Sequence, residues 1–205
     1  MRFVSLWLSA VCIIVFILQF VFGSDMFVLE KSLLTVEPWR VVTSIFAHGS
    51  IAHLLSNLFA LGLFGLILEG RIGARRVLFL FFVTGIIVNL FSPYDSSLGA
   101  SGAIFGILGA LIVLRPLMVV WIDFIPMPMI IAGLFWLGSD ILGIFIPDSV
   151  GHIAHIFGLV VGLLFGFFWW KDFGDDISWK KKKGGRKDVF LERGLDYFER
   201  REGLR

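Results

Sequence analysis

Charged residues and cysteine are scarce in this chain. Only 17% of its 205 residues are charged while 58% are hydrophobic, and the mean hydropathy is +0.91. A soluble globular domain carries about 25% charged and about 45–50% apolar residues. The single cysteine, Cys12, excludes a disulfide framework and a cysteine-based metal site. The composition therefore indicates a polytopic membrane protein.

Six stretches are long or apolar enough to cross a bilayer, which takes roughly 20 helical residues. They predict an all-α membrane domain over residues 1–170, with helices at Phe3–Phe22, Ile51–Leu68, Val77–Leu90, Gly99–Leu114, Met127–Ile146 and His152–Trp170. The first stretch has an early arginine, as a signal peptide does. Its apolar run is longer than that of a signal peptide and no small-residue cleavage site is clear, so we count it as a crossing.

The basic residues are distributed unevenly. Of the 18 lysines and arginines, 11 follow residue 170, which separates a basic tail at 171–205 from the membrane domain. With six crossings, all but Lys31 and Arg40 fall on one side, so both termini are predicted to be cytoplasmic. The run Lys180–Lys183 suits an anionic lipid surface. No nucleic-acid-binding motif is present.

The loop at 23–50 is predicted to face outward and to lie in the membrane interface. Its Trp39 suits the headgroup level, and Arg40 is expected to snorkel towards water. A simple linker is less consistent with its length.

One serine stands in the apolar run LGASGAIFGILGA at residues 98–110. In the predicted topology Ser101 begins the fourth helix at the outer side. His53 and Asn57 lie near the outer start of the second helix, and His155 lies near that of the sixth. At about 1.5 Å per residue, all four side chains fall at similar shallow depths. Polar groups inside a membrane are costly, so this convergence suggests a functional site.

The spacing of these residues allows two interpretations. His53 and Asn57 are four residues apart and share a helix face. They could hydrogen-bond to a neighbouring helix, or they could donate to a negative charge that develops during a reaction.

Small residues form a matching pair of stripes on the fourth and sixth helices. Ala154, Gly158 and Gly162 repeat every four residues, as do Gly102 and Gly106. Such stripes let two membrane helices approach closely. Close packing would bring the Ser101 hydroxyl near the His155 imidazole, as activation of a nucleophile requires. The alternative is that the stripes serve packing alone.

Two further polar features remain open. Four histidines, with His152 and His155 three apart, raise the question of a metal, but the HExxH motif is missing and no carboxylate lies on the same turn. We therefore predict no metal and no cofactor. Asp140, within the fifth helix, could orient a histidine or satisfy hydroxyls and backbone of a neighbouring helix. We favour the structural role.

These motifs together resemble those of the rhomboid intramembrane serine proteases. The resemblance extends over residues 35–170 and rests on WR at 39–40, HGSIAHLLSN at 48–57, EGRIG at 69–73, GASG at 99–102 and AHIFGLVVG at 154–162. The resemblance implies a minimal six-helix rhomboid-like bundle. It also implies a Ser–His dyad without an aspartate partner.

By this resemblance, Ser101 is the nucleophile and His155 the general base. His53, Asn57 and the Ser101 backbone N–H would bind the oxyanion. The supporting residues are Gly99, Gly102, Phe105, Ala154 and Gly158. Many family members carry a tyrosine that stacks on the histidine, and this chain has Phe105 there, which can stack but has no hydroxyl.

The expected function is cleavage of single-span membrane proteins near the outer side of the bilayer. The expected partners are the lipid bilayer and transmembrane substrates. One alternative is a catalytically inert relative that binds membrane proteins, although this chain keeps both Ser101 and His155. A second alternative is a transporter. Many transporters are built from internal repeats, and this sequence shows none.

Overall fold

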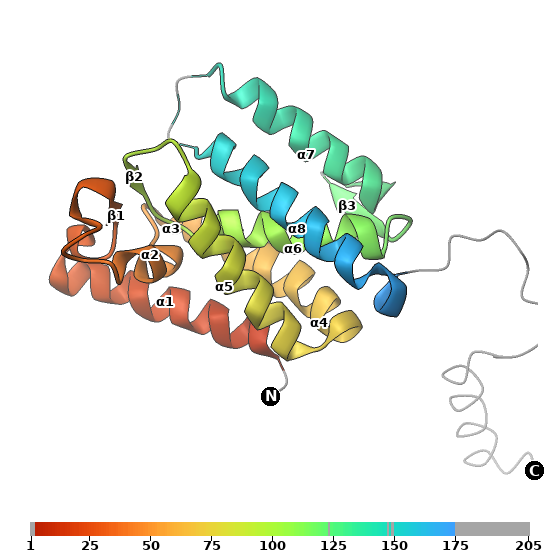
Figure 1. Ribbon diagram of the computed structural model, residues 1–205, viewed down its shortest axis with the longest axis horizontal. Helices are drawn as coiled ribbons and strands as arrows, with labels where there is room; N and C mark the ends of the chain where they lie inside the picture. The colour runs from red at the N-terminus through yellow and green to blue at the C-terminus, as the bar shows by residue number, and fades with distance from the viewer. Residues whose placement is uncertain (1–2, 123, 147, 149, 175–205) are drawn as a thin grey trace, which may run out of the picture. The chain divides into compact units, whose positions relative to one another are not determined.

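The structure is a computed structural model that describes residues 3–122, 124–146, 148 and 150–174. These residues form a bundle of helices (Figure 1). The longer elements are α1 (Val4–Phe22), α3 (Ile51–Ala60), the π-helical turn η4 (Leu61–Gly65), α4 (Leu66–Ile72), α5 (Ala74–Phe91), α6 (Ser101–Leu114), α7 (Met129–Gly143) and α8 (His152–Phe173). The predicted tail at 171–205 lies outside the described residues except for positions 171–174, so its separation from the membrane domain stays a prediction.

Within the described residues, four helices are long and apolar enough to cross a membrane. They are α1, α5, α8 and the continuous helix Ile51–Ile72 that α3, η4 and α4 form together. The apolar helices α6 and α7 are shorter. Four of the six predicted crossings thus have clear counterparts, and the count of six stays a prediction.

Two helices begin two residues later than predicted, and α5 begins earlier, at Ala74 instead of Val77. Gly99 has φ +115° and precedes α6, which begins at Ser101. Met127 and Pro128 belong to β4 (Ile125–Pro128), which pairs with β3 (Val119–Ile122), so α7 begins only at Met129. The cause at Met127 is the proline that follows it, because the residue before a proline disfavours helical backbone angles.

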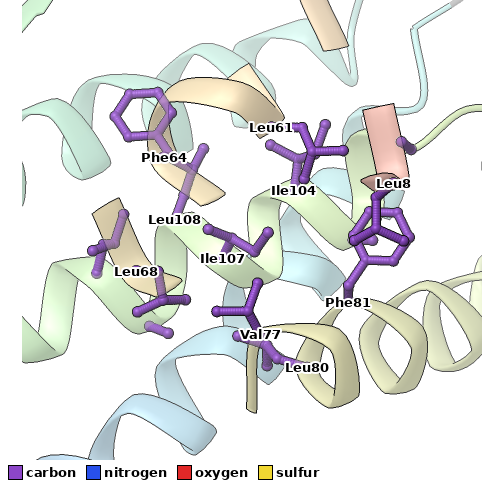
Figure 2. Packing of buried hydrophobic residues seen from close by; sticks show 14 of the residues in the cluster. Leu8, Leu61, Phe64, Leu68, Val77, Leu80, Phe81, Ile104, Ile107 and Leu108 are labelled. Atoms are coloured by element: carbon purple, nitrogen blue, oxygen red, sulfur yellow. The ribbon is translucent and has the colours of Figure 1, made fainter. Parts of the chain in front are cut away.

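Helix α6 lies at the centre of the buried cluster, and 11 of its 14 residues are buried. In Figure 2 its Ile104, Ile107 and Leu108 meet side chains from three other segments. These neighbours are Leu8 of α1, Leu61, Phe64 and Leu68 of the second long helix, and Val77, Leu80 and Phe81 of α5. A helix enclosed in this way has no place for a charge, which explains why none occurs between Asp95 and Arg115.

Glycines bring α6 and α8 into backbone contact. A methyl group on Gly158 would overlap the carbonyl oxygen of Gly102, and one on Gly162 would overlap that of Gly106. A third contact, which the sequence did not indicate, sets Gly109 against the carbonyl oxygen of Leu159. The two predicted stripes therefore do face each other.

The segment from Gly23 to Ser50 is folded against the bundle. It contains η1 (Ser24–Met26), β1 (Leu29–Glu30), η2 (Lys31–Leu33), α2 (Arg40–Thr43) and η3 (Ser44–Phe46), and β1 pairs with β2 (Ser96–Ser97). Asn89 of α5 donates hydrogen bonds from Nδ2 to Val41 O (2.8 Å) and Ser44 Oγ (3.0 Å).

The expectation that Arg40 snorkels towards water is wrong. Its side chain is buried, donates to the carbonyl oxygens of Asp25 and Val28, and pairs with Glu37. Turns with unpaired carbonyl groups need donors, and a guanidinium supplies several. Trp39 beside it is 56% exposed.

The contact between α6 and α8 predicts that Gly162→Ala destabilises the protein strongly. Its methyl group meets backbone, which cannot rotate away, so we expect a loss of about 1–3 kcal/mol or more in the free energy of unfolding. Gly138→Ala in α7 is the matched control, since a methyl group there meets nothing within 4 Å. It should leave stability unchanged or raise it by about 0.5–1 kcal/mol. Unfolding in mixed micelles measures both, and equal stabilities would contradict the packing described.

Candidate active site

Ser101 is the first residue of α6 and is half-buried. The turn before it depends on Gly99, whose φ of +115° is unfavourable for other residues. The Gly99 N–H donates to Ser44 O at 2.9 Å, which ties the turn to η3. As the first residue of a helix, Ser101 has a backbone N–H without an acceptor in its own helix.

His53 lies directly against this turn. A β-carbon on Gly99 would come within 2.7 Å of His53 Cε1, so the absence of a side chain at Gly99 makes room for the ring. Asn57 is buried one turn further along α3 and donates from Nδ2 to His53 O at 2.8 Å. The start of α3 is fixed by Ser50, whose Oγ accepts the His53 N–H at 3.1 Å.

The His48 ring packs against the His53 ring. The two rings meet edge to face with centroids 5.0 Å apart. The His48 backbone exchanges two hydrogen bonds with the Gln19 amide of α1, at 2.9 and 3.2 Å. Burial and, to a smaller extent, the neighbouring His53 lower the pKa of His48 from 6.5 to about 4. His48 is therefore neutral at physiological pH.

His155 lies on α8 and stacks on Phe105 of α6. The ring centroids are 4.3 Å apart and the planes differ by 6°. Phe105 is four residues after Ser101, so both lie on one face of α6. Gly158, one turn after His155, makes the backbone contact with Gly102. The structure thus places His155 over the face of α6 that begins at Ser101.

No hydrogen bond joins Ser101 Oγ to the His155 ring in the part of the chain that the structure describes. The two residues are related through Phe105 and through the contact of Gly158 with Gly102. Catalytic hydrogen bonds are often long before substrate binds and shorten in the complex. Ala154, also predicted to support the site, lies beside Gly151 at the start of α8.

Asp140 of α7 corrects two expectations. The favoured structural role gives it hydroxyls or backbone of a neighbouring helix as partners, and the family resemblance implies a histidine without an aspartate partner. Instead Asp140 Oδ1 lies 3.0 Å from His155 Nδ1 and 2.7 Å from His152 Nδ1. Asp140 is 5% exposed, and a buried carboxylate needs such donors. The sequence signal was the acidic residue at membrane depth, but the register that joins α7 to α8 is a tertiary feature.

The carboxylate determines the tautomer of His155. An ionised carboxylate only accepts hydrogen bonds, so Nδ1 of each histidine carries the proton. In neutral His155 the other nitrogen, Nε2, then keeps its lone pair and can accept a proton. This is the arrangement that a general base requires.

Comparison with known proteins identifies the family of this chain. The family model described as Rhomboid domain matches residues 35–172. The chain belongs to the rhomboid family. Together with its apolar helices, this makes it a multi-pass membrane protein.

Several named rhomboids are similar to this chain. Rhomboid protease GlpG of Serratia proteamaculans (strain 568) is 30% identical over 181 residues, which cover 80% of this chain and 62% of GlpG. RHOMBOID-like protein 4 of Arabidopsis thaliana is 33% identical over 135 residues, 64% of this chain and 34% of that protein. Rhomboid protease GluP of Bacillus subtilis (strain 168) is 46% identical over 88 residues, 40% of this chain and 17% of GluP. The chain thus spans about a third of the length of the Arabidopsis relative.

The Asp140 contact predicts the protonation state of the His155 ring. Nitrogen NMR of histidine-labelled protein at a pH where the ring is neutral should show the proton on Nδ1. Asp140→Ala should move part of the population to the Nε2 form, because the carboxylate acceptor is gone. Asp148→Asn, which changes an exposed partner of His152 Nε2 (3.3 Å), should leave the His155 signals in place. An unaltered His155 tautomer in Asp140→Ala would refute the assignment.

Proposed function

We propose that this rhomboid is a serine endopeptidase that cleaves single-span membrane proteins. One observation carries the proposal: the His155 ring lies on the α6 face that begins at Ser101, with its Nδ1 on the Asp140 carboxylate. A serine at a helix start, a histidine base and a group that orients the base are the parts of nucleophilic acyl transfer.

In the proposed reaction, Ser101 Oγ attacks the carbonyl carbon of the scissile peptide bond and its proton passes to His155 Nε2. The imidazolium that forms is stabilised by Asp140. His155 then gives the proton to the leaving amine, and the C–N bond breaks to leave an acyl ester on Ser101. Water, deprotonated by His155, hydrolyses this ester and restores the hydroxyl.

The oxyanion of the tetrahedral intermediate would be bound by three groups. They are the Ser101 backbone N–H, the His53 ring and the Asn57 amide. The contact of His53 with Gly99 supports this role, because it holds the ring two residues from the nucleophile. One Asn57 N–H bonds to His53 O, and the amide has a second N–H to donate. Preorganised donors of this kind commonly supply several kcal/mol to catalysis.

We further propose that both termini are cytoplasmic and that the site opens towards the outer side. The support is the distribution of lysine and arginine along the chain, of which 16 of 18 fall on one side in a six-helix topology. Substrates are then cut near the outer boundary of the bilayer.

The direct test is cleavage of a single-span reporter in proteoliposomes. Ser101→Ala and His155→Ala should each lower kcat by a factor of about 10³ or more, because the nucleophile or its base is lost. Ser9→Ala, which removes a hydroxyl that bonds within α1, is the control and should retain full activity. An inert rhomboid that only binds membrane proteins would bind the reporter without cutting it. Undiminished cleavage by pure Ser101→Ala protein would rule out the proposed nucleophile.

The role of Asp140 gives a separate prediction. Asp140→Asn keeps the shape of the side chain but removes the charge that orients His155, so kcat should fall at least ~10-fold. KM should stay the same, because Asp140 touches no substrate in the proposed mechanism. Asp148→Asn is the matched control on the exposed side of the same histidine pair. If Asp140→Asn lowered the free energy of unfolding and left kcat unchanged, Asp140 would have a structural role only.

A further inference from the structure

Three side chains of metal-binding type meet at the outer turn of α8. Asp140, His152 and His155 each offer one ligand atom, and these atoms lie within 4.8 Å of one another. The Nδ1 atoms of both histidines face Asp140 Oδ1. The sequence places the two histidines three residues apart, and the fold adds the carboxylate from α7. The prediction of no metal rests partly on the lack of a carboxylate beside the histidines in the sequence. In the folded chain the Asp140 carboxylate does lie beside them.

The proposed peptidase chemistry explains only part of this cluster. Orienting His155 takes one hydrogen bond to Asp140, yet His152 shares the same oxygen at a shorter distance, 2.7 Å against 3.0 Å. The second oxygen, Asp140 Oδ2, is buried and has no hydrogen-bond partner among the residues that the structure describes. An unsatisfied buried carboxylate oxygen costs free energy, and a cation bound to the carboxylate would offset that cost, because it attracts the negative charge that both oxygens share.

The two rings are held in orientations that point Nδ1 at the carboxylate. His155 is fixed by its stack on Phe105. The His152 ring occupies the space above Gly143, where a methyl group would overlap it, and its Nε2 lies 3.3 Å from Asp148 Oδ2. Both histidine side chains are 13% exposed, so the cluster can be reached from outside the bundle.

We propose that Asp140, His152 and His155 form an inhibitory site for a divalent transition-metal ion of the zinc type. Two imidazoles, one carboxylate and a fourth position for water are a ligand set that Zn²⁺ adopts. With metal–ligand bonds of about 2.0–2.2 Å, tetrahedral ligand atoms lie about 3.4 Å apart. In the free site both Nδ1 atoms lie closer than this to Oδ1, at 2.7 and 3.0 Å, and the three ligand atoms lie within 4.8 Å of one another, so the side chains have to adjust to admit the ion.

A metal ion at this site would inhibit the reaction because it changes which nitrogen of His155 carries the proton. In the free site the neutral His155 carries its proton on Nδ1. The metal bonds to the Nδ1 lone pair, so the neutral ring exchanges that proton through water for one on Nε2, with no net change in charge. His155 Nε2 then donates and cannot accept the Ser101 proton. This inference rests on the proposed role of His155 as the base.

The experiment compares the full chain with His152→Gln in reporter cleavage during a Zn²⁺ titration. Glutamine can still donate to Asp140 but is a poor zinc ligand. In EDTA the two proteins should cleave equally well. Zn²⁺ should inhibit the unaltered protein, and the concentration for half inhibition should rise ~10–100-fold or more in His152→Gln. Equal inhibition of both would overturn the site, as would Mg²⁺ inhibiting as strongly as Zn²⁺, because Mg²⁺ prefers oxygen ligands.

A second arm needs no activity. Co²⁺ added to the Ser101→Ala protein should give the visible absorption of a four-coordinate site, complete at one equivalent. The double variant Ser101→Ala/His152→Gln should not give this absorption. Gly143→Ala, whose methyl group displaces the His152 ring, should weaken the spectrum if His152→Gln does not fold. If the chain does not cleave even in EDTA, the proposed function fails while the Co²⁺ spectrum still decides the metal site.

Discussion

The backbones of α6 and α8 touch each other, and the buried core and the candidate site are arranged around this contact. Gly158 and Gly162 lie against the carbonyl oxygens of Gly102 and Gly106, where no side chain fits. In a bilayer, helices gain little by hiding apolar surface from lipid, so close packing of this kind drives their association. The same contact lays the His155 ring on Phe105 and sets its height relative to Ser101. Packing and chemistry are thus two results of one interaction.

Around this contact, the buried charged side chains have partners that the fold supplies. Asp140 is buried because two histidines donate to it, and Arg40 is buried because turns of the 23–50 segment offer it carbonyl oxygens. His53 stays beside the site because Gly99 leaves room for its ring. Among the described residues, four buried side-chain atoms have no hydrogen-bond partner: Thr43 Oγ1, His48 Nε2, Thr84 Oγ1 and Asp140 Oδ2. Asp140 Oδ2 is the one that belongs to a carboxylate, and it lies in the proposed metal site.

The sequence predicted those features that depend on spacing within one helix. The glycine stripes and the shared face of His53 and Asn57 are of this kind, and the structure has both. The stack of Phe105 on His155 joins two helices, and only the family resemblance suggested it. The sequence did not reveal features that depend on the register between separate segments. Whether Asp140 meets a hydroxyl, a carbonyl or His155 is decided by how α7 packs beside α8, and the burial of Arg40 by how its loop folds. Helix ends moved where Gly99 and Pro128 change the backbone.

The central claim is that the fold makes Ser101 an activated nucleophile through His155. The most direct measurement is labelling of the purified protein with a fluorophosphonate, which phosphonylates activated serines, followed by peptide mapping by mass spectrometry. The account predicts one label, on Ser101, and its loss in folded His155→Ala protein. No label, a label on another serine, or equal labelling of Ser101 without His155 would contradict it.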